Sequence, residues 1–178
     1  KSTSAANLAV TLSHQGVATL LIDGDLRRGT LHEIFGVDRT PGLAEVLREE
    51  VELGEALRSI ELAGGRLDIL PSGAHPENPS ELIGGQRMEL VLQDLIDRYD
   101  RILIDTPPLR SATDAAVLCS MPYTGALMVA RAGFSDRHAI EEVARELQEM
   151  GIRVDGVIIN DVAVSERPAY GYHSVYAD

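Results

Sequence analysis

The sequence predicts an α/β domain in which a doubly wound, mostly parallel sheet is flanked by helices. Short apolar runs that read as buried strands alternate with segments of helical periodicity along most of the chain. Only 4% of the residues are aromatic while 44% are hydrophobic, so Leu, Ile, Val and Ala must build the core. The periodicity stops at residue 161, which predicts a domain over residues 1–160 and a flexible tail over 161–178.

The expected elements follow one another in a regular order. Strands are expected at residues 18–22, 66–70, 101–105, 125–130 and 154–159. Helices are expected at residues 5–12, 43–47, 88–99, 113–121 and 136–150, with a short helix or turn at 29–35 and a weaker helical pattern over 51–60. Ser80 and Ser135 stand where each would cap the helix that follows it.

Composition excludes several classes of function. The formal net charge of −12 argues against non-specific binding to nucleic acid or to an anionic membrane surface. The single cysteine, Cys119, rules out an internal disulfide and fits a reducing compartment. No apolar run approaches the roughly 18–20 residues that span a bilayer, and no signal peptide is visible. We therefore expect a soluble domain with no nucleic-acid partner.

Two of the expected strands end in carboxylates. One apolar run ends at Asp23, and Asp25 follows after a single glycine; a second run ends at Asp105, and two prolines then direct the chain out of the sheet. In open α/β sheets ligands bind beyond the carboxyl ends of the strands, where such acids can approach a metal-bound phosphate. Either acidic strand end, taken alone, is explained equally well as a turn with solvated carboxylates. The occurrence of both in one chain favours a phosphate- or metal-binding site.

The chain begins with Lys1-Ser2-Thr3 and runs directly into a helix rich in Ala and Leu. A phosphate-binding P-loop reads G-x-x-x-x-G-K-[ST], so Lys1 and Ser2 match its last two positions. In such a loop the lysine neutralises phosphate charge, the hydroxyl ligates Mg²⁺, and backbone N–H groups hold phosphate oxygens. The alternative is a simple helix cap, for which Ser and Thr are common. The motif's glycines and the strand before them are expected upstream of Lys1.

The C-terminal part holds two further candidates. Asn160 follows the last expected strand, where its amide can read an adenine base, although Asn is also a frequent turn residue. Tyr170, Tyr172 and Tyr176 lie among the last nine residues, together with Pro168 and Gly171. We expect their phenol groups to be exposed, either as phosphate acceptors or as part of a segment that docks on a partner.

In combination these features resemble the bacterial tyrosine kinases (BY-kinases), the cytoplasmic kinase domains of exopolysaccharide and capsule co-polymerases. The resemblance extends from Lys1 to the tail and is more specific than a P-loop match alone. It is carried by Lys1–Thr3 with Ala6–Ala9, Leu21–Arg28, Gly42–Leu47, Ser72–Leu82, Ile102–Pro108, Val129–Gly133 and the tyrosine-rich end. The segment after the first acidic strand departs from the family in having Gly24 where Ala is usual and Gly29 where Pro is frequent.

The resemblance implies a role for each matching residue. Lys1, Ser2 and Thr3 become the end of the Walker A motif, and Asp105 becomes the Walker B acid. Asp23 and Asp25 become the acids of the Walker A′ motif. From the place of Asp23 at the strand end we expect it nearer the metal and Asp25 nearer the incoming hydroxyl, an assignment that can be reversed. The catalytic set is then Lys1, Asp23 and Asp25; the metal set Ser2, Asp23 and Asp105; the nucleotide set Lys1, Ser2, Thr3, Arg131 and Asn160; and the acceptors Tyr170, Tyr172 and Tyr176.

The resemblance also implies an activity and its setting. It implies an ATP-dependent protein tyrosine autokinase that uses ATP and Mg²⁺, yields ADP, and regulates exopolysaccharide or capsule synthesis and export. The implied partners are other copies of the chain, in a ring that phosphorylates in trans, and a membrane co-polymerase or activator segment. The implied location is the cytoplasmic side of the bacterial inner membrane. The family shares its fold with MinD/ParA-type P-loop ATPases, so a partitioning ATPase is one alternative. A degenerate nucleotide-binding assembly domain is the other.

Overall fold

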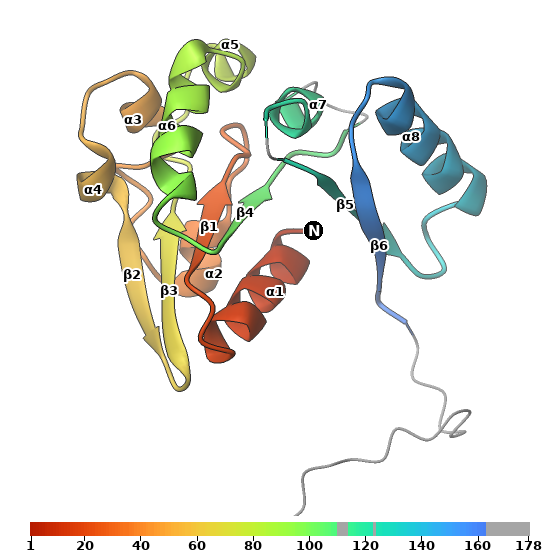
Figure 1. Cartoon of the computed structure of the whole chain (residues 1–178), viewed down its shortest axis with the longest axis horizontal. Coiled ribbons are helices and arrows are strands. Elements are labelled where there is room, and N and C mark those ends of the chain that lie inside the picture. The colour runs from red at the N-terminus through yellow and green to blue at the C-terminus, as the bar shows by residue number, and fades with distance from the viewer. Residues whose placement is uncertain (110–113, 123, 163–178) are drawn as a thin grey trace, which may run out of the picture.

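The computed structural model describes residues 1–109, 114–122 and 124–162 (Figure 1). Its strands form a four-stranded and a two-stranded sheet. In the larger sheet, β1 pairs in parallel with both β3 and β4, and only the edge strand β2 is antiparallel. In spatial order these strands are β2 (Arg58–Leu62), β3 (Gly65–Leu70), β1 (Thr19–Asp23) and β4 (Arg101–Asp105).

The strand β1 lies at the centre of the packing, and all five of its residues are buried. Because successive side chains of a strand point to opposite faces, β1 contributes to two separate cores. Leu20 and Ile22 belong to one core, while Leu21 belongs to the other. The sheet is therefore apolar on both faces, which explains why the β1 sequence is a continuous rather than an alternating apolar run.

Helices cover each face of the larger sheet. On one face, α1 (Ser2–His14) and α2 (Leu31–Phe35) contribute to the core that contains Leu21. On the other, α3 (Leu43–Leu47) and α6 (Gln86–Ile96) contribute to the core that contains Leu20 and Ile22. The predicted doubly wound arrangement with a mostly parallel sheet is confirmed.

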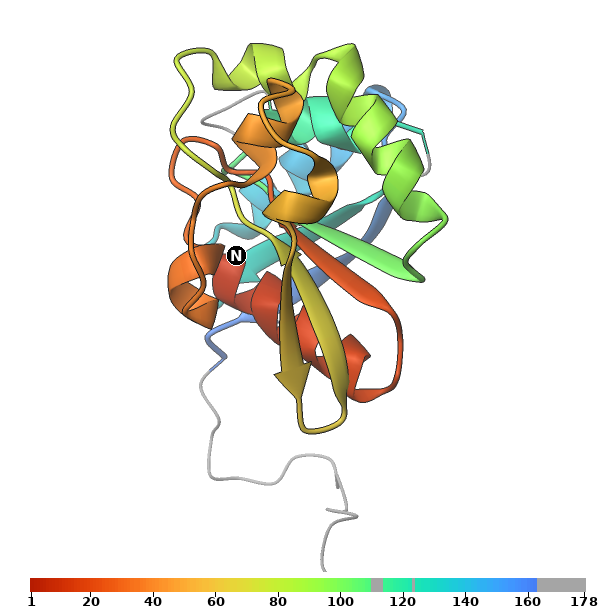
Figure 2. The ribbon, with the colours of Figure 1, turned by 90° about the vertical axis from the view of Figure 1, so that its left-hand side faces the viewer.

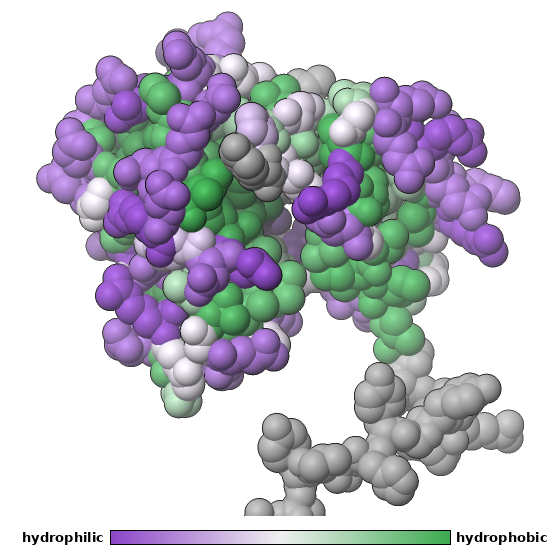
Figure 3. Space-filling view, in the orientation of Figure 1, coloured by the Kyte–Doolittle hydropathy of each residue, from purple (hydrophilic) through white to green (hydrophobic). Residues whose placement is uncertain are grey.

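The smaller sheet pairs β5 (Ala126–Arg131) with β6 (Val154–Asn160) in parallel, and α8 (Arg137–Glu149) packs on one of its faces. Among the described residues, β4 pairs only with β1 and β5 pairs only with β6, so each keeps one unpaired edge. Figure 3 shows the surface hollowed between the part built on β1–β4 and the part built on β5 and β6, with hydrophobic side chains on both sides.

One predicted segment has a different structure. The weak helical pattern over residues 51–60 is wrong in its second half, since only α4 (Leu53–Ala56) is helical and β2 begins at Arg58. The alternating half-buried and exposed residues of β2 allow it to pair with β3 as an edge hairpin, which Figure 2 shows facing the viewer. Pairing with β3 decides that this segment is a strand, because a short segment without a strong propensity adopts the structure that buries its side chains.

Both predicted serine caps are also wrong. Ser80 lies inside α5 (Pro79–Ile83), whose N-cap is Asn78, and α8 is capped by the carboxylate of Asp136, which accepts the backbone N–H of His138. The Ser135 hydroxyl instead accepts the backbone N–H of Arg131. The remaining helix, α7 (Asp114–Cys119), follows β4. Within the described ranges, no helix has the length and apolar character needed to cross a bilayer.

Candidate functional site

The two strand-ending acids lie side by side at the carboxyl edge of the larger sheet. Asp23 and Asp105 are register partners on the neighbouring parallel strands β1 and β4, and both are buried. The backbone N–H of Gly24 donates to the Asp105 carbonyl oxygen (2.8 Å), which carries the pairing one residue beyond β1. The sequence predicted an acid at the end of each strand, and the strand order brings the two together.

The buried Asp23 carboxylate is held by backbone donors of its own loop. Its Oδ2 accepts the N–H of Leu31 (3.0 Å) and its Oδ1 accepts the N–H of Asp25 (3.3 Å). Burial removes water from the carboxylate and raises its pKa from 3.8 to about 6, although these N–H groups act in the opposite direction. The nearby charges of Asp105 and Asp25 raise the pKa further. A cation bound here would relieve this cost of ionisation.

Asp25 is partly exposed and differs from Asp23 in its surroundings. Its Oδ1 accepts the backbone N–H groups of Arg27 (3.1 Å) and Arg28 (2.9 Å), so the carboxylate caps the turn that follows it. Among the described residues no donor to Oδ2 is recorded. Because Asp25 is partly exposed, a ligand at the sheet edge can reach its carboxylate.

A third set of side chains at this edge was not expected from the sequence. Arg27 Nε donates to Asp114 Oδ2 (3.2 Å), and Arg27 Nη2 donates to Ser80 Oγ (2.8 Å). The Ser80 hydroxyl in turn donates to Asp114 Oδ1 (2.6 Å). Sequence reasoning missed these contacts because Arg27 and Asp114 lie 87 residues apart. The only local signal was an arginine two residues after Asp25.

The helix α1 begins with the predicted Walker A residues. Lys1 occupies the N-cap position without a side-chain cap hydrogen bond, so the simple capping interpretation of Lys1-Ser2-Thr3 is not supported. Lys1 and Thr3 are exposed and Ser2 is half-buried. The first backbone N–H groups of a helix have no partner within the helix, and together with its dipole they favour an anion. This end of α1 thus presents a cation, hydroxyl groups and backbone donors together.

Two residues of the predicted nucleotide set, Arg131 and Asn160, lie at the end of the smaller sheet. Arg131 and Asn160 are register partners at the C-terminal ends of β5 and β6, and both are exposed. The Arg131 guanidinium donates to Asp161 Oδ2 (2.7 Å) and lies over the ring of Phe134, 5.8 Å from its centroid. No recorded contact among the described residues joins this pair to Asp23 or Asp105. Tyr170, Tyr172 and Tyr176 lie outside the described residues.

The donor set fits a magnesium ion that also binds phosphate. Within the described ranges no three His, Cys, Asp or Glu side chains converge as a protein-only metal site. Mg²⁺ is usually held by one or two carboxylates and completed by water and phosphate oxygens. The adjacent carboxylates of Asp23 and Asp105 match that chemistry, and the predicted third ligand, the Ser2 hydroxyl, is half-buried at the start of α1.

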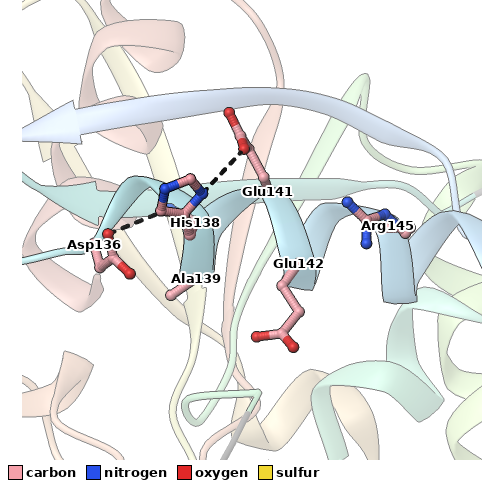
Figure 4. Close-up of a pocket in the computed structure, with 6 residues that line it drawn as sticks. All are labelled: Asp136, His138, Ala139, Glu141, Glu142 and Arg145. Atoms are coloured by element: carbon pink, nitrogen blue, oxygen red, sulfur yellow. Dashed lines mark hydrogen bonds and ion pairs between the residues drawn. The ribbon is translucent and has the colours of Figure 1, made fainter.

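A surface hollow on α8 lies away from these acids, on the outer side of the smaller sheet (Figures 1 and 4). Two of its carboxylates already have partners: Glu141 pairs with Arg137, which lies beside the hollow, and contacts His138, while Asp136 accepts the backbone N–H of His138. We assign it no functional role. The residues that line it are Asp136, His138, Ala139, Glu141, Glu142 and Arg145.

Comparison with known proteins identifies the family. The AAA domain family matches residues 1–130. The tyrosine-protein kinase YwqD of Bacillus subtilis is 34% identical over 173 residues, which cover 97% of this chain and 72% of YwqD. The kinase domain of the Escherichia coli tyrosine kinase ETK has a TM-score of 0.82 and 34% identity, covering 94% of this chain and 66% of that one.

A nucleotide-bound relative extends the similarity to the wider fold. MinD from Pyrococcus horikoshii, complexed with Mg-ADP, has a TM-score of 0.71 and 30% identity, covering 93% of this chain and 66% of that one. Other tyrosine-protein kinases are much longer, and the chain spans only 23% of the length of the Acinetobacter johnsonii kinase. The chain belongs to the bacterial tyrosine kinase family, and it has the fold of the P-loop ATPases.

Proposed function

We propose that this domain is an ATP-dependent tyrosine autokinase, which transfers the ATP γ-phosphoryl group to tyrosines of the C-terminal cluster. The observation that carries the proposal is the pairing of Asp23 with Asp105 at one sheet edge, with Asp25 following in the same loop. Family membership supplies the type of reaction. The proposed acceptors are Tyr170, Tyr172 and Tyr176.

The proposed nucleotide site depends on residues upstream of Lys1. The unpaired edges of β4 and β5 and the hollow between the two sheets support the insertion of one further strand there. Such a strand would join the two sheets and end next to the start of α1, where the P-loop glycines are required. In this arrangement Lys1, Ser2 and Thr3 hold the phosphates, while Arg131 and Asn160 lie on the side of the base.

Each acid has a distinct proposed task. Mg²⁺ bound by Ser2, Asp23 and Asp105 would neutralise charge on the phosphate oxygens. The phenol oxygen of the acceptor attacks the γ-phosphorus, the bond to the bridging β–γ oxygen breaks, and ADP leaves. A carboxylate is a far weaker base than a phenolate, so the phenol keeps its proton until the bond to phosphorus begins to form. In a loose transition state Asp25 orients the hydroxyl and accepts its proton late.

We further propose that the tail is phosphorylated in trans, in a ring-like homo-oligomer that works with a membrane co-polymerase or activator segment on the cytoplasmic side of the inner membrane. Phosphorylation adds roughly −1.5 to −2 charges per tyrosine. The chain already carries a net charge of −12, so these charges favour separation of the subunits. This supports phosphorylation as a switch that regulates exopolysaccharide or capsule synthesis.

The alternative enzyme is a partitioning ATPase, supported by the similarity to MinD. The same acids would then serve hydrolysis, and no phosphotyrosine would form. A degenerate nucleotide-binding fold that serves only assembly is the third possibility. It would require that the P-loop glycines be absent upstream of Lys1.

The deciding experiment uses the chain together with the residues that precede Lys1. The protein is incubated with Mg-ATP, and phosphate is located by mass spectrometry in the wild type, in Lys1→Met, and in a variant with Tyr170, Tyr172 and Tyr176 changed to Phe. Tyr99→Phe is the matched control, because the Tyr99 hydroxyl is bound to Asp68 and is no proposed acceptor.

We expect phosphate on the tail that is lost in Lys1→Met, is lost in the triple variant and persists in the Tyr99 control. Hydrolysis of ATP without phosphotyrosine would reject the kinase and favour the partitioning ATPase. Absence of nucleotide binding would leave only the assembly domain.

A further inference from the structure

We propose that Arg27 is a positioning residue that fixes the Asp25 carboxylate by fastening its loop to two helices. The group formed by Arg27, Ser80 and Asp114 is called the Arg27 clamp below. The inference rests on the proposed function, because its consequence for activity concerns phosphoryl transfer. It assigns a task to side chains that neither bind phosphate nor contact the metal in the proposed mechanism.

The clamp is a closed set of hydrogen bonds. The guanidinium of Arg27 donates from Nε to Asp114 and from Nη2 to Ser80, and the Ser80 hydroxyl donates to the second oxygen of Asp114. Each group therefore contacts both of the others. An arginine suits this place because its planar group presents several donors in a fixed geometry, which a lysine does not.

The clamp is anchored in the core. Asp114 is 1% exposed, so its carboxylate depends on the arginine and the hydroxyl in place of water. It lies at the start of α7, which contacts α5, and both helices place side chains, Leu118 and Ile83, in one buried core. Leu26, the neighbour of Arg27, belongs to the same core. The position of the arginine is thus set by packed elements.

The clamp acts on Asp25 through a single residue. While the Arg27 side chain is held by Asp114 and Ser80, its backbone N–H donates to Asp25 Oδ1 (3.1 Å). Any displacement of the Arg27 backbone therefore displaces a donor of the Asp25 carboxylate. Segments that follow three neighbouring strands are joined at this point, since Arg27 lies in the loop after β1, Ser80 in α5 after β3, and Asp114 at the start of α7 after β4. A displacement of about 1 Å in a catalytic side chain is enough to lower the reaction rate substantially.

The test compares Arg27→Ala with Arg28→Ala in the chain that includes the residues preceding Lys1. Arg28 is the matched control because it lies in the same loop, carries the same charge, and has no recorded side-chain partner among the described residues. For Arg27→Ala we expect kcat for tail phosphorylation to fall roughly 10- to 100-fold while KM for ATP changes less than about twofold. Arg27→Lys should restore part of kcat, and Arg28→Ala should retain wild-type values.

A double-mutant cycle separates positioning from general destabilisation. If Arg27 acts through Asp25, the loss of kcat in Arg27→Ala/Asp25→Asn should equal that in Asp25→Asn alone. Multiplicative losses would overturn the inference, because they would mean that the two residues act independently. A wild type without phosphoryl transfer would refute the proposed function instead.

Hydrogen–deuterium exchange then tests the clamp without reference to activity. In the wild type the Asp25 carboxylate accepts the backbone N–H groups of Arg27 and Arg28, so a peptide spanning residues 24–29 should exchange slowly. We expect exchange in this peptide to be several-fold faster in Arg27→Ala and unchanged in Arg28→Ala. Equal exchange in the two variants would reject the clamp, whatever the enzyme is found to do.

Discussion

The two sheets of this domain differ in how completely they are packed. In the larger sheet β1 is buried along its whole length, and helices cover both faces. In the smaller sheet α8 covers one face, while Leu127, Val157 and Ile159 are 45%, 46% and 63% exposed. The candidate acids therefore lie on a sheet that is stabilised by its own helices. The candidate nucleotide-binding residues Arg131 and Asn160 lie on a sheet that leaves large apolar side chains exposed.

The largest expected difference between the sheets concerns their side-chain packing. Leu21 of β1 is fully buried, whereas Leu127 of β5 is nearly half exposed. We expect Leu21→Ala to lower the free energy of unfolding by roughly 2–5 kcal/mol, because it leaves a cavity in a closed core. Leu127→Ala should cost less than about 1 kcal/mol. Urea denaturation followed by circular dichroism measures both, and equal losses would contradict the comparison.

The next effect is a pH dependence that comes from Asp23. Its pKa is raised from 3.8 to about 6 in the folded protein, so the unfolded chain releases this proton first as pH rises. Between these values the folded state holds more protons than the unfolded state, and the free energy of unfolding falls with rising pH. The loss continues until pH exceeds the folded-state pKa by about one unit and amounts to at most ~3 kcal/mol.

The measurement for Asp23 is chemical denaturation at several pH values in metal-free buffer. The stability of Asp23→Asn relative to the wild type should increase from pH 4 to pH 7, because the variant has no carboxylate to ionise. Asp38→Asn, which changes an exposed carboxylate, is the control and should remain parallel to the wild type. If the difference in the free energy of unfolding between Asp23→Asn and the wild type is the same at every pH, burial does not raise the pKa of Asp23.

A smaller effect is expected at the opposite end of the larger sheet. The hydroxyl of Tyr99 donates to Asp68 Oδ2 (2.8 Å), and the same carboxylate also accepts from Ser59 (2.6 Å). Tyr99→Phe removes one of several donors to a charged group, so we expect a loss of about 1–2 kcal/mol in the free energy of unfolding. In the background of Asp68→Asn the same change should cost much less, and an unchanged cost would show that packing is responsible.

The smallest effect on stability is expected in the smaller sheet. The ion pair between Arg131 and Asp161 is short, but both side chains are more than half exposed. Arg131→Ala should therefore change the free energy of unfolding by less than about 1 kcal/mol. If Arg131 contributes to nucleotide binding, KM for ATP should nevertheless rise, which steady-state kinetics can measure. A large loss of stability without a change in KM would assign Arg131 to the fold instead.

Much of the larger sheet could be predicted from local sequence. The continuous apolar run of β1 is visible because burial on both faces requires it, and the acids that end β1 and β4 are visible because each interrupts an apolar run. The helix at residues 43–47 was predicted with the bounds of α3. The metal set and the nucleotide set remain predictions, and the tyrosine cluster lies outside the described residues.

The sequence by itself determined that this is a doubly wound domain of the bacterial tyrosine kinase family, with acids at the ends of two strands. Tertiary structure alone decided which strands are neighbours, and so which acids meet. It placed Asp23 beside Asp105, converted residues 58–62 into an edge strand, and joined Arg27 to Asp114 across 87 positions. The physical reason is that apolar periodicity records which side chains are buried, whereas the partner of a buried polar group is set by chain topology.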